Sequence, residues 1–593
     1  MTKGRLLSLR QQLRDLGLQG FVVPHADEHQ NEYTPANAER LAWLTGFTGS
    51  AGEAVLTLSE GAIYVDGRYT LQVRQQTDRN QFTPLNLYED KMEDWLVDRV
   101  GKGDRIGYDP WLHTREWIGK VSEKLSEKGA LFVPLDDNPI DQVWQDRPAD
   151  SDAPAVAHPI EYSGEDSLHK RERIGADIKS KGADAAVLTL LDSIAWLFNI
   201  RGRDVAHTPL VSSYAILFAD GSATLYIDPG KVNKELKAFL GDSVKLTSKS
   251  VFPAGLVKLK KKRVLVDPKR SHAAVFELLD KAGAVIVEGQ DPCLLPKAMK
   301  NDVEIKGTRA AHNRDAVAVC KFLAWLDTAG PKGSIDEAAA AEKLLSFREE
   351  QDLFRDTSFD TISGAGPNGA IVHYRVTPDS SRTLEPDMLY LVDSGGQYLD
   401  GTTDITRTVC IGTPTEEQKD RFTRVLKGHI ALAQARFPHG RSGAHLDSLA
   451  RKPLWDVGLD YDHGTGHGVG SYLGVHEGPQ SISRLGFGVP LEQGMILSNE
   501  PGYYKEGEYG IRIENLILVR ERRFDEEERP MLSFETLTHV PIDKRLINAY
   551  MMTTAEITWF NIYHAQVREI VGPHLTGKER EWLMRATESL MVL

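Results

Sequence analysis

A run of histidine and glycine residues between positions 463 and 479 constrains the fold of this chain more than any other feature. It reads His463-Gly464-Thr465-Gly466-His467-Gly468-Val469-Gly470 and, after five residues, His476-Glu477-Gly478-Pro479. Glycine inside a helix or strand lowers stability, so clustered glycines indicate that the backbone closely approaches another group. Histidines at such a point can ligate a metal ion or carry a proton. The run therefore predicts a functional site rather than a packed core.

Two acidic residues lie in apolar segments upstream of this run. Asp393 follows the apolar segment 389–392 and precedes a Gly-Gly turn, and Asp404 lies in a second strand-like segment, 403–409. An antiparallel hairpin would bring Asp393 and Asp404 side by side at one end of a sheet. Two carboxylates that close repel each other and raise the pKa of one of them, and divalent cations between them remove that penalty.

Two further acidic residues lie downstream of the run. Glu500 stands beside a predicted turn in the segment 499–504, and Glu514 lies in the apolar-rich, strand-like segment 511–518. A bare charge in an apolar strand is costly to bury. Together with His467, the four carboxylates form an oxygen-rich set that suits two divalent cations sharing bridging ligands. The sequence therefore predicts a metal-dependent hydrolase.

These five residues and their neighbours resemble the ligand set of the pita-bread metallopeptidases, which include methionine aminopeptidase, prolidase and X-Pro aminopeptidase. The segments most similar to the X-Pro aminopeptidase branch are 463–470, 475–479, 499–504 and 510–515. The resemblance covers nearly the whole chain and is to the long, three-domain cytosolic form. It implies an α/β (α+β) fold, with two similar N-terminal α/β modules before a pita-bread domain, and it implies a homodimer.

The resemblance also implies how the ligands divide between two divalent metal ions. Asp393 would chelate one cation, and His467 and Glu500 would hold the second. Asp404 and Glu514 would bridge both. Manganese is the usual activator in the family, and the ligand chemistry also permits cobalt or zinc. A hydroxide held by the two ions would attack the carbonyl of the N-terminal residue of a peptide, and the bond from this carbonyl to a proline at the second position would break.

Three histidines and one of the ligands are the candidate catalytic residues. His373 and His476 match family histidines that stabilise the tetrahedral oxyanion or pass a proton to the prolyl nitrogen. The alternative for His373 is a core histidine, since we expect the segment 371–376 to be an apolar strand. His463 either binds substrate or holds the glycine-rich loop through hydrogen bonds, and Glu500 is an alternative general base.

Arg68 and Trp455 are candidate substrate-binding residues. Arg68 stands in the phrase Asp66-Gly67-Arg68-Tyr69, which is typical of the family, and it would reach the mouth of the active site. Its alternative is a structural salt bridge. Trp455 precedes His463 by eight residues and would line the pocket near the cleaved bond. Its alternative is a buried tryptophan without a role in binding.

The first half of the chain contains an internal repeat. A helical pattern, a strand, a further apolar segment and a strand pair follow one another in residues 5–69, and the same order returns in residues 174–228. We therefore expect two similar α/β modules, 1–150 and 151–297, and a catalytic domain, 298–593. Its C-terminal helical extension, about 545–593, is expected to break at Gly572-Pro573 and to cap the domain without a chemical role.

The composition disfavours several classes of partner. The chain has 85 acidic and 71 basic residues, a net charge of −14, which disfavours nucleic acid and anionic membranes. Three widely spaced cysteines provide no disulfide framework, and the N-terminal segment has the pattern of an amphipathic helix rather than a signal peptide. No apolar run is long enough to cross a bilayer. We therefore expect a cytoplasmic protein that acts on peptides.

The sequence offers four alternatives to an X-Pro aminopeptidase: a dinucleotide site and three other kinds of protein. The segment 364–369 fits G-x-G-x-x-G, but the strand expected after it excludes a dinucleotide site. Prolidase, which cleaves Xaa-Pro dipeptides, shares the five ligands but usually has one N-terminal module. A creatinase-like enzyme without metal, or a non-enzymatic binding protein on the same fold, would lack some of the ligands. The duplicated first half and the complete ligand set favour an X-Pro aminopeptidase.

Overall fold

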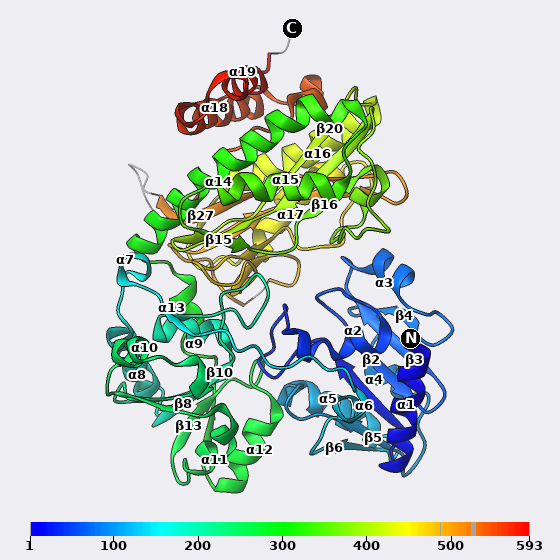
Figure 1. Ribbon diagram of the computed structural model, residues 1–593, viewed down its shortest axis with the longest axis vertical. Coiled ribbons are helices and arrows are strands. Elements are labelled where there is room, and N and C mark those ends of the chain that lie inside the picture. The colour runs from blue at the N-terminus through cyan, green and yellow to red at the C-terminus, as the bar shows by residue number, and fades with distance from the viewer. Residues whose placement is uncertain (1, 487, 523–528, 592–593) are drawn as a thin grey trace. The chain divides into compact units, whose positions relative to one another are not determined.

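The computed structural model describes residues 2–486, 488–522 and 529–591 (Figure 1). The chain forms two compact units. The N-terminal unit consists of Met1–Ile160 and Glu165–Leu294, and the C-terminal unit consists of Glu161–Gly164 and Leu295–Leu593. Among the helices of the described ranges, none combines the length and the apolar character needed to cross a bilayer.

The N-terminal unit contains two sheets with the same topology. The first has the order β4-β3-β2-β1-β5-β6, with strands at Thr83–Asn86, Gly61–Val65, Glu53–Thr57, Gly20–Pro24, Arg105–Tyr108 and Leu131–Pro134. The second has the order β12-β11-β10-β8-β13-β14, with strands at Val244–Thr247, Ala223–Ile227, Ser213–Phe218, Ala185–Leu188, Arg263–Val266 and Val285–Glu288. In both, three central strands pair antiparallel and the outer strands add in parallel. The identical order and direction confirm the predicted repeat.

Helices accompany each sheet in a similar sequence order. Those of the first module are α1 (Thr2–Asp15), α2 (Arg40–Thr45), α3 (Thr70–Gln76), α4 (Met92–Val97), α5 (Arg115–Ser126) and α6 (Pro139–Val143). Those of the second include α8 (Ser167–Ser180), α9 (Leu191–Phe198), α10 (Lys234–Leu240), α11 (Phe252–Val257) and α12 (Ala273–Ala282). In α1, Leu6, Leu9 and Leu13 recur at helical spacing and are buried, so one face of the helix packs on the core.

The C-terminal unit is built on two sheets that carry the predicted ligands. The smaller sheet has the order β16-β17-β20, with strands at Ile362–Ala365, Met388–Ser394 and Ile405–Ile411. The larger sheet has the order β21-β28-β27-β24-β22-β23, with strands at Arg436–Pro438, Met531–Thr536, Asn515–Arg522, Ile496–Asn499, Gly466–Gly468 and Glu477–Ile482. The helices of this unit before the C-terminal extension include α14 (Asp302–Ala329), α15 (Glu337–Glu349), α16 (Glu416–Ala433) and α17 (Ala444–Trp455).

The predicted hairpin around Asp393 and Asp404 is present. β17 and β20 pair antiparallel, and Ser394 lies opposite Ile405 in the register. Between them, β18 (Gly396–Tyr398) and β19 (Gly401–Thr402) form a separate small sheet with β15 (Phe354–Thr357). Asp393 is therefore near the end of one strand and Asp404 directly before the start of its partner.

The prediction of a strand at 371–376 is wrong. A 3-10 helix, η5 (Gly366–Ala370), has Pro367 in its first turn, where a fixed φ and a missing N–H are tolerated. The chain then turns, and the backbone N–H of Tyr374 donates to the carbonyl of Ile371 at 3.0 Å. This turn uses backbone groups that a strand would offer to a neighbour, so the apolar side chains here do not indicate a sheet.

The prediction of Glu514 inside a strand is also wrong. Glu514 lies in a short gap between β26 (Tyr509–Arg512) and β27. β26 pairs with β25 (Gly502–Lys505) in a two-stranded sheet, whereas β27 pairs with β24 in the larger sheet. The chain passes from one sheet to the other at Glu514, and this change of sheet is not visible in a continuous apolar pattern.

Two helices close the described chain. They are α18 (Thr554–Val571) and α19 (Gly577–Ala586), separated by the short 3-10 helix η8 (Gly572–His574). The predicted break at Gly572-Pro573 is confirmed, because proline cannot supply the N–H that a continuing helix needs. Buried residues of α18, including Phe560, Tyr563 and Val567, join the main core of the C-terminal unit.

Candidate metal centre

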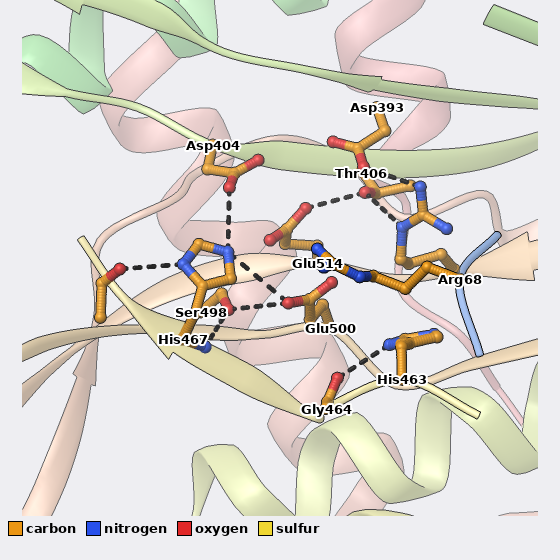
Figure 2. A network of polar contacts seen from close by, with 12 residues as sticks. Arg68, Asp393, Asp404, Thr406, His463, Gly464, His467, Ser498, Glu500 and Glu514 are labelled. Carbon is orange, nitrogen blue, oxygen red and sulfur yellow. Dashed lines mark hydrogen bonds and ion pairs between the residues drawn. The ribbon is translucent and has the colours of Figure 1, made fainter. Parts of the chain in front are cut away.

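All five predicted ligands belong to the C-terminal unit and lie in or directly beside five different strands. Asp393 lies in β17, Asp404 directly precedes β20, and His467 is the middle residue of β22. Glu500 directly follows β24, and Glu514 lies in the gap before β27. Figure 2 shows the five side chains grouped together, with the His467 ring between the carboxylates of Asp404 and Glu500.

His467 is oriented so that one ring nitrogen faces carboxylates. Its Nε2 lies 3.3 Å from Asp404 Oδ2 and 3.6 Å from Glu500 Oε1. Its Nδ1 lies 2.9 Å from the carbonyl oxygen of Gly468. Because a carbonyl only accepts, Nδ1 carries the proton, and the lone pair of Nε2 is directed toward the acids. Ligand atoms of Asp404, His467 and Glu514 all lie within 4.8 Å of one another.

The carboxylates fit bound cations because each of three has an oxygen without a hydrogen-bond partner. Asp393, Asp404 and Glu514 are 7%, 4% and 1% exposed. Among the described residues, none hydrogen-bonds to Oδ1 of either aspartate or to Oε1 of the glutamate. A buried, unpaired charged oxygen is costly, and a divalent cation supplies the missing partner. Carboxylate oxygens with one imidazole are ligands that hard and borderline divalent ions accept.

Mutual repulsion strengthens the case for cations. Burial, then the negative charges of Asp393 and Glu500, raise the pKa of Asp404 well above its usual range. Burial, then the charge of Asp404, raise the pKa of Glu514 in the same way. The protein holds these acids together although each disfavours the ionised form of the next. Positive ions between them would stabilise the ionised forms.

Two glycines explain how His467 reaches this position. A Cβ atom on Gly466 would lie 2.0 Å from the carbonyl oxygen of Ser498, and one on Gly468 would lie 2.2 Å from the carbonyl oxygen of Glu477. The close approach that the glycine run predicts is therefore to the neighbouring strands of its own sheet. The glycines let β24 and β23 flank His467 tightly, and the Ser498 hydroxyl accepts from the His467 backbone N–H at 2.9 Å.

The structure brings the two proposed proton-transfer histidines to the same place. The ring centroids of His467 and His476 are 4.3 Å apart, and those of His476 and His373 are 6.4 Å apart. His476 directly precedes β23, and His373 lies in the turn that replaces the predicted strand. His373 is therefore not a core residue of a sheet.

His463 is held at the edge of the ligand group by a tyrosine. Its Nδ1 lies 2.8 Å from the carbonyl oxygen of Gly464, so this nitrogen carries the proton. Its Nε2 accepts from the hydroxyl of Tyr504 at 2.8 Å. The bond to Gly464 fixes the loop of His463, as one of its two predicted alternatives states, and the bond from Tyr504 holds the other side of the ring.

Arg512 and Tyr504 belong to the site and were missed by the sequence analysis. Arg512 Nη2 donates to Asp393 Oδ2 at 2.7 Å, and Nη1 donates to the Tyr504 hydroxyl at 2.6 Å. Arg512 is only 1% exposed. The available signal was an arginine between Ile511 and Ile513, because an arginine in an apolar strand needs a buried acid as partner.

Hydroxyl groups support two further ligands, Glu514 and Glu500. Thr406 Oγ1 donates to Glu514 Oε2 at 2.8 Å and leaves the other carboxylate oxygen without a protein partner. Ser498 Oγ similarly donates to Glu500 Oε1 at 3.1 Å. These bonds orient the carboxylates, as the outer neighbours of metal ligands commonly do.

Arg68 and Trp455 do not join the five ligands within the described residues of the C-terminal unit. Arg68 lies in the N-terminal unit, where its guanidinium pairs with Glu32 at 3.0 Å and Asp66 at 2.7 Å. The salt-bridge alternative for Arg68 is thus present. Trp455 ends α17 and is 48% exposed, so the alternative of a buried tryptophan is wrong. The substrate-binding roles of both residues stay predictions.

Comparison with protein families divides the chain into matching segments. The models named "Creatinase/Prolidase N-terminal domain" match residues 5–143 and 146–304. The model of metallopeptidase family M24 matches residues 306–521, and that of the C-terminal region of peptidase M24 matches residues 530–590.

Similar proteins share nearly the whole length of the chain. Aminopeptidase P1 of Arabidopsis thaliana is 39% identical, with 97% of each chain covered. A probable Xaa-Pro aminopeptidase P of Aspergillus niger is 39% identical, with 99% of each chain covered. The crystal structure of the X-prolyl aminopeptidase of Caenorhabditis elegans, described as a cytosolic enzyme with a di-nuclear active site, matches with a TM-score of 0.95 and 34% identity over 100% of both chains.

A prolidase-type structure matches less of the chain. The Xaa-Pro dipeptidase of Bacillus anthracis is 21% identical, covers 64% of this chain with 99% of its own, and has a TM-score of 0.51, which shows a shared fold. The comparisons confirm the predicted resemblance and fold class. The chain belongs to the aminopeptidase P branch of metallopeptidase family M24.

Proposed function

We propose that this protein is an Xaa-Pro aminopeptidase that uses two divalent metal ions to hydrolyse the N-terminal Xaa-Pro bond of peptides. The observation that carries the proposal is the group of three buried carboxylates, each with an unpartnered oxygen, beside the Nε2 of His467. Relatives named as Xaa-Pro aminopeptidases, similar over nearly the full length, support the same reaction.

We assign the ligands as the sequence analysis predicts. Asp393 would bind one ion, and His467 and Glu500 the other. Asp404 and Glu514 would bridge the two ions. When bound, the ions supply a nucleophilic water at neutral pH and polarise the peptide carbonyl. Mn²⁺ is the proposed native metal, with Co²⁺ and Zn²⁺ as the alternatives that the donor set accepts.

The histidines of the chain would handle the proton that the leaving group needs. The nitrogen of an X-Pro bond is that of a tertiary amide without an N–H, and it must gain a proton to leave as the secondary amine of proline. The His476 ring is near those of both His467 and His373, and we assign to His373 and His476 the stabilisation of the oxyanion and the delivery of this proton. Glu500 is the proposed general base. His463, which is held by its hydrogen bond from Tyr504, would line the substrate side of the centre.

Cleavage of matched peptides tests this function. Chelator-stripped protein would be incubated with an Xaa-Pro-Xaa tripeptide and with the corresponding Xaa-Pro dipeptide, each with and without Mn²⁺, and the released residue measured by mass spectrometry. We expect metal-dependent cleavage of the tripeptide with the dipeptide nearly intact. Preference for the dipeptide would instead make the protein a prolidase, and no cleavage of either would contradict a peptidase function.

We also propose a division of the chain and a setting for its activity. The proposed domains are 1–150, 151–297 and 298–593, and the last includes a helical extension from about 545. Limited proteolysis would test these boundaries. The proposed state is a cytoplasmic homodimer that acts on peptides with proline at the second position, without nucleic-acid or membrane partners. The three cysteines are buried, and no disulfide joins them in the described ranges, which agrees with a reducing compartment.

A further inference from the structure

A buried arginine, Arg407, lies on the strand that follows the ligand Asp404. It belongs to β20 and is only 1% exposed. Its side chain has no carboxylate among its hydrogen-bond acceptors in the described part of the chain; its acceptors are the carbonyl oxygens of Thr406, Glu514, Val540 and Pro541, the amide oxygen of Asn515 and the hydroxyl of Tyr563. A fully buried guanidinium with neutral acceptors depends on all of them for its position.

The first set of these bonds reaches the backbone of a proposed metal ligand. Arg407 Nη1 donates to the carbonyl oxygen of Glu514 at 2.7 Å and to that of Thr406 at 2.8 Å. The Glu514 N–H donates to the same Thr406 carbonyl at 3.2 Å. Arg407 therefore holds the backbone of the segment between the two sheets in which Glu514 lies.

The second set of bonds reaches the C-terminal helical extension. Arg407 Nη2 donates to the hydroxyl of Tyr563, in α18, at 2.9 Å. The same hydroxyl donates to the carbonyl oxygen of Val540 at 2.8 Å and accepts from the Val540 N–H at 3.2 Å. Tyr563 is 2% exposed, and its ring stacks on Trp559 at 5.3 Å between centroids. One phenol oxygen thus joins α18 to the arginine that holds Glu514.

A parallel route leads to the other glutamate ligand. Asn515 Oδ1 accepts from Arg407, and Asn515 Nδ2 lies 3.3 Å from His429 Nε2. His429 Nδ1 lies 3.1 Å from the carbonyl oxygen of Asn499, the residue before Glu500. Arg407 therefore occupies the centre of a buried polar network that contacts the backbone next to both Glu500 and Glu514.

We propose that Arg407 and Tyr563 are positioning residues of the metal centre, through which the C-terminal extension holds Glu514 in place to bridge the two ions. The inference rests on the proposed function and gives the extension a role beyond capping. Neither side chain is assigned a contact with the ions or the substrate. Loss of the Tyr563 hydroxyl would loosen Arg407, and loosening Arg407 would let the backbone of Glu514 shift.

Mn²⁺ binding to full-length, chelator-stripped protein tests this proposal. Tyr563→Phe removes only the hydroxyl and keeps the ring stack on Trp559. We expect it to raise the Kd for Mn²⁺ about tenfold, the lower end of the loss typical for outer neighbours of metal ligands. Arg407→Lys, which keeps the charge but loses the planar fork, should raise the Kd more, about 100-fold. Tyr550→Phe is the matched control, because Tyr550 is 80% exposed and its variant should bind Mn²⁺ unchanged.

A melting curve of each metal-free variant and the electron paramagnetic resonance spectrum of bound Mn²⁺ accompany the titration. A changed spectrum together with the raised Kd would support a positioning role. A lowered melting temperature with an unchanged Mn²⁺ affinity and spectrum in Tyr563→Phe would show a purely structural role and overturn the proposal, even if Arg407→Lys fails to fold. Failure of the unmodified protein to bind any of Mn²⁺, Co²⁺ and Zn²⁺ would overturn the proposed function as well, so the two failures are distinguishable.

Discussion

The residue after His476 takes part in a group of three buried charges. Glu477, the next residue, is fully buried, with its carboxylate 2.8 Å from Lys297 Nζ and 2.5 Å from Lys300 Nζ. Both lysines are also buried and precede α14. The Glu477 carboxylate is the negative partner of both buried ammonium groups, so the stability of this ion triad depends on Glu477.

Replacement of that shared member should be strongly destabilising. Glu477→Gln leaves two buried ammonium groups without a negative partner, and we expect the free energy of unfolding to fall by about 3–5 kcal/mol. Urea denaturation followed by tryptophan fluorescence measures this. Glu508→Gln is the control, because the Glu508 carboxylate is 54% exposed and its loss should cost at most about 1 kcal/mol. Equal losses in the two variants would show that the triad contributes no special stability.

At the scale of elements, the position of His467 depends on how closely β22 packs between its neighbours. The Cβ atom of an alanine at Gly466 would lie 2.0 Å from the Ser498 carbonyl oxygen, so β22 and β24 would have to separate. We expect Gly466→Ala to lower the free energy of unfolding by about 3 kcal/mol, as overpacking does, and to weaken Mn²⁺ binding. Denaturation and metal titration of the same samples measure both effects.

Gly464 offers a control for the same chemical change in the same run. A Cβ atom there meets nothing closer than 3.4 Å, from the Ser483 side chain. Gly464→Ala should therefore leave the stability within about 1 kcal/mol of the unmodified protein, the cost of losing glycine's flexibility being small. If Gly466→Ala were as stable and bound Mn²⁺ as tightly, the close packing of β22 would not position His467.

Sequence patterns predicted the elements better than the contacts between them. The repeated order of apolar segments predicted two matching modules, and the segment around Asp393 and Asp404 predicted their hairpin, because both are local patterns. The prediction of a strand at 371–376 failed because the 3-10 helix before this segment, which begins with a proline, determines the path of the chain. Arg512 was missed as a partner of Asp393 because 119 residues separate them, and no local pattern records such a pairing.

At the scale of the whole molecule, the two modules of the N-terminal unit meet at buried and partly buried aromatic rings. His272 is fully buried, contacts the ring of Trp111 at 4.6 Å between centroids, and lies 6.0 Å from that of Tyr214. Among the described residues, neither of its ring nitrogens has a hydrogen-bond partner. Burial lowers the pKa of His272 to about 3, so the folded protein favours the neutral ring.

Acid should therefore weaken this junction. Because the folded pKa lies below the unfolded value of about 6.5, the contribution of His272 is fully present above pH 6.5 and is lost as the pH falls toward 3. Between pH 7 and pH 5 the loss from this residue is about 2 kcal/mol. In His272→Leu, the decrease in the free energy of unfolding over this interval should be smaller by that amount. The exposed His574→Leu variant should show the same pH dependence as the unmodified protein, and an identical dependence in His272→Leu would contradict the assignment.

The central claim is that the buried carboxylates and His467 hold two metal ions. The number of Mn²⁺ ions bound per chain after equilibrium dialysis, measured by elemental analysis, tests it most directly. We predict two ions in the unmodified protein and one or none in Glu514→Gln, which removes a bridging carboxylate without changing its size. Glu508→Gln, at an exposed glutamate, should retain two. Fewer than two ions in the unmodified protein, or two retained in Glu514→Gln, would contradict the dinuclear centre described here.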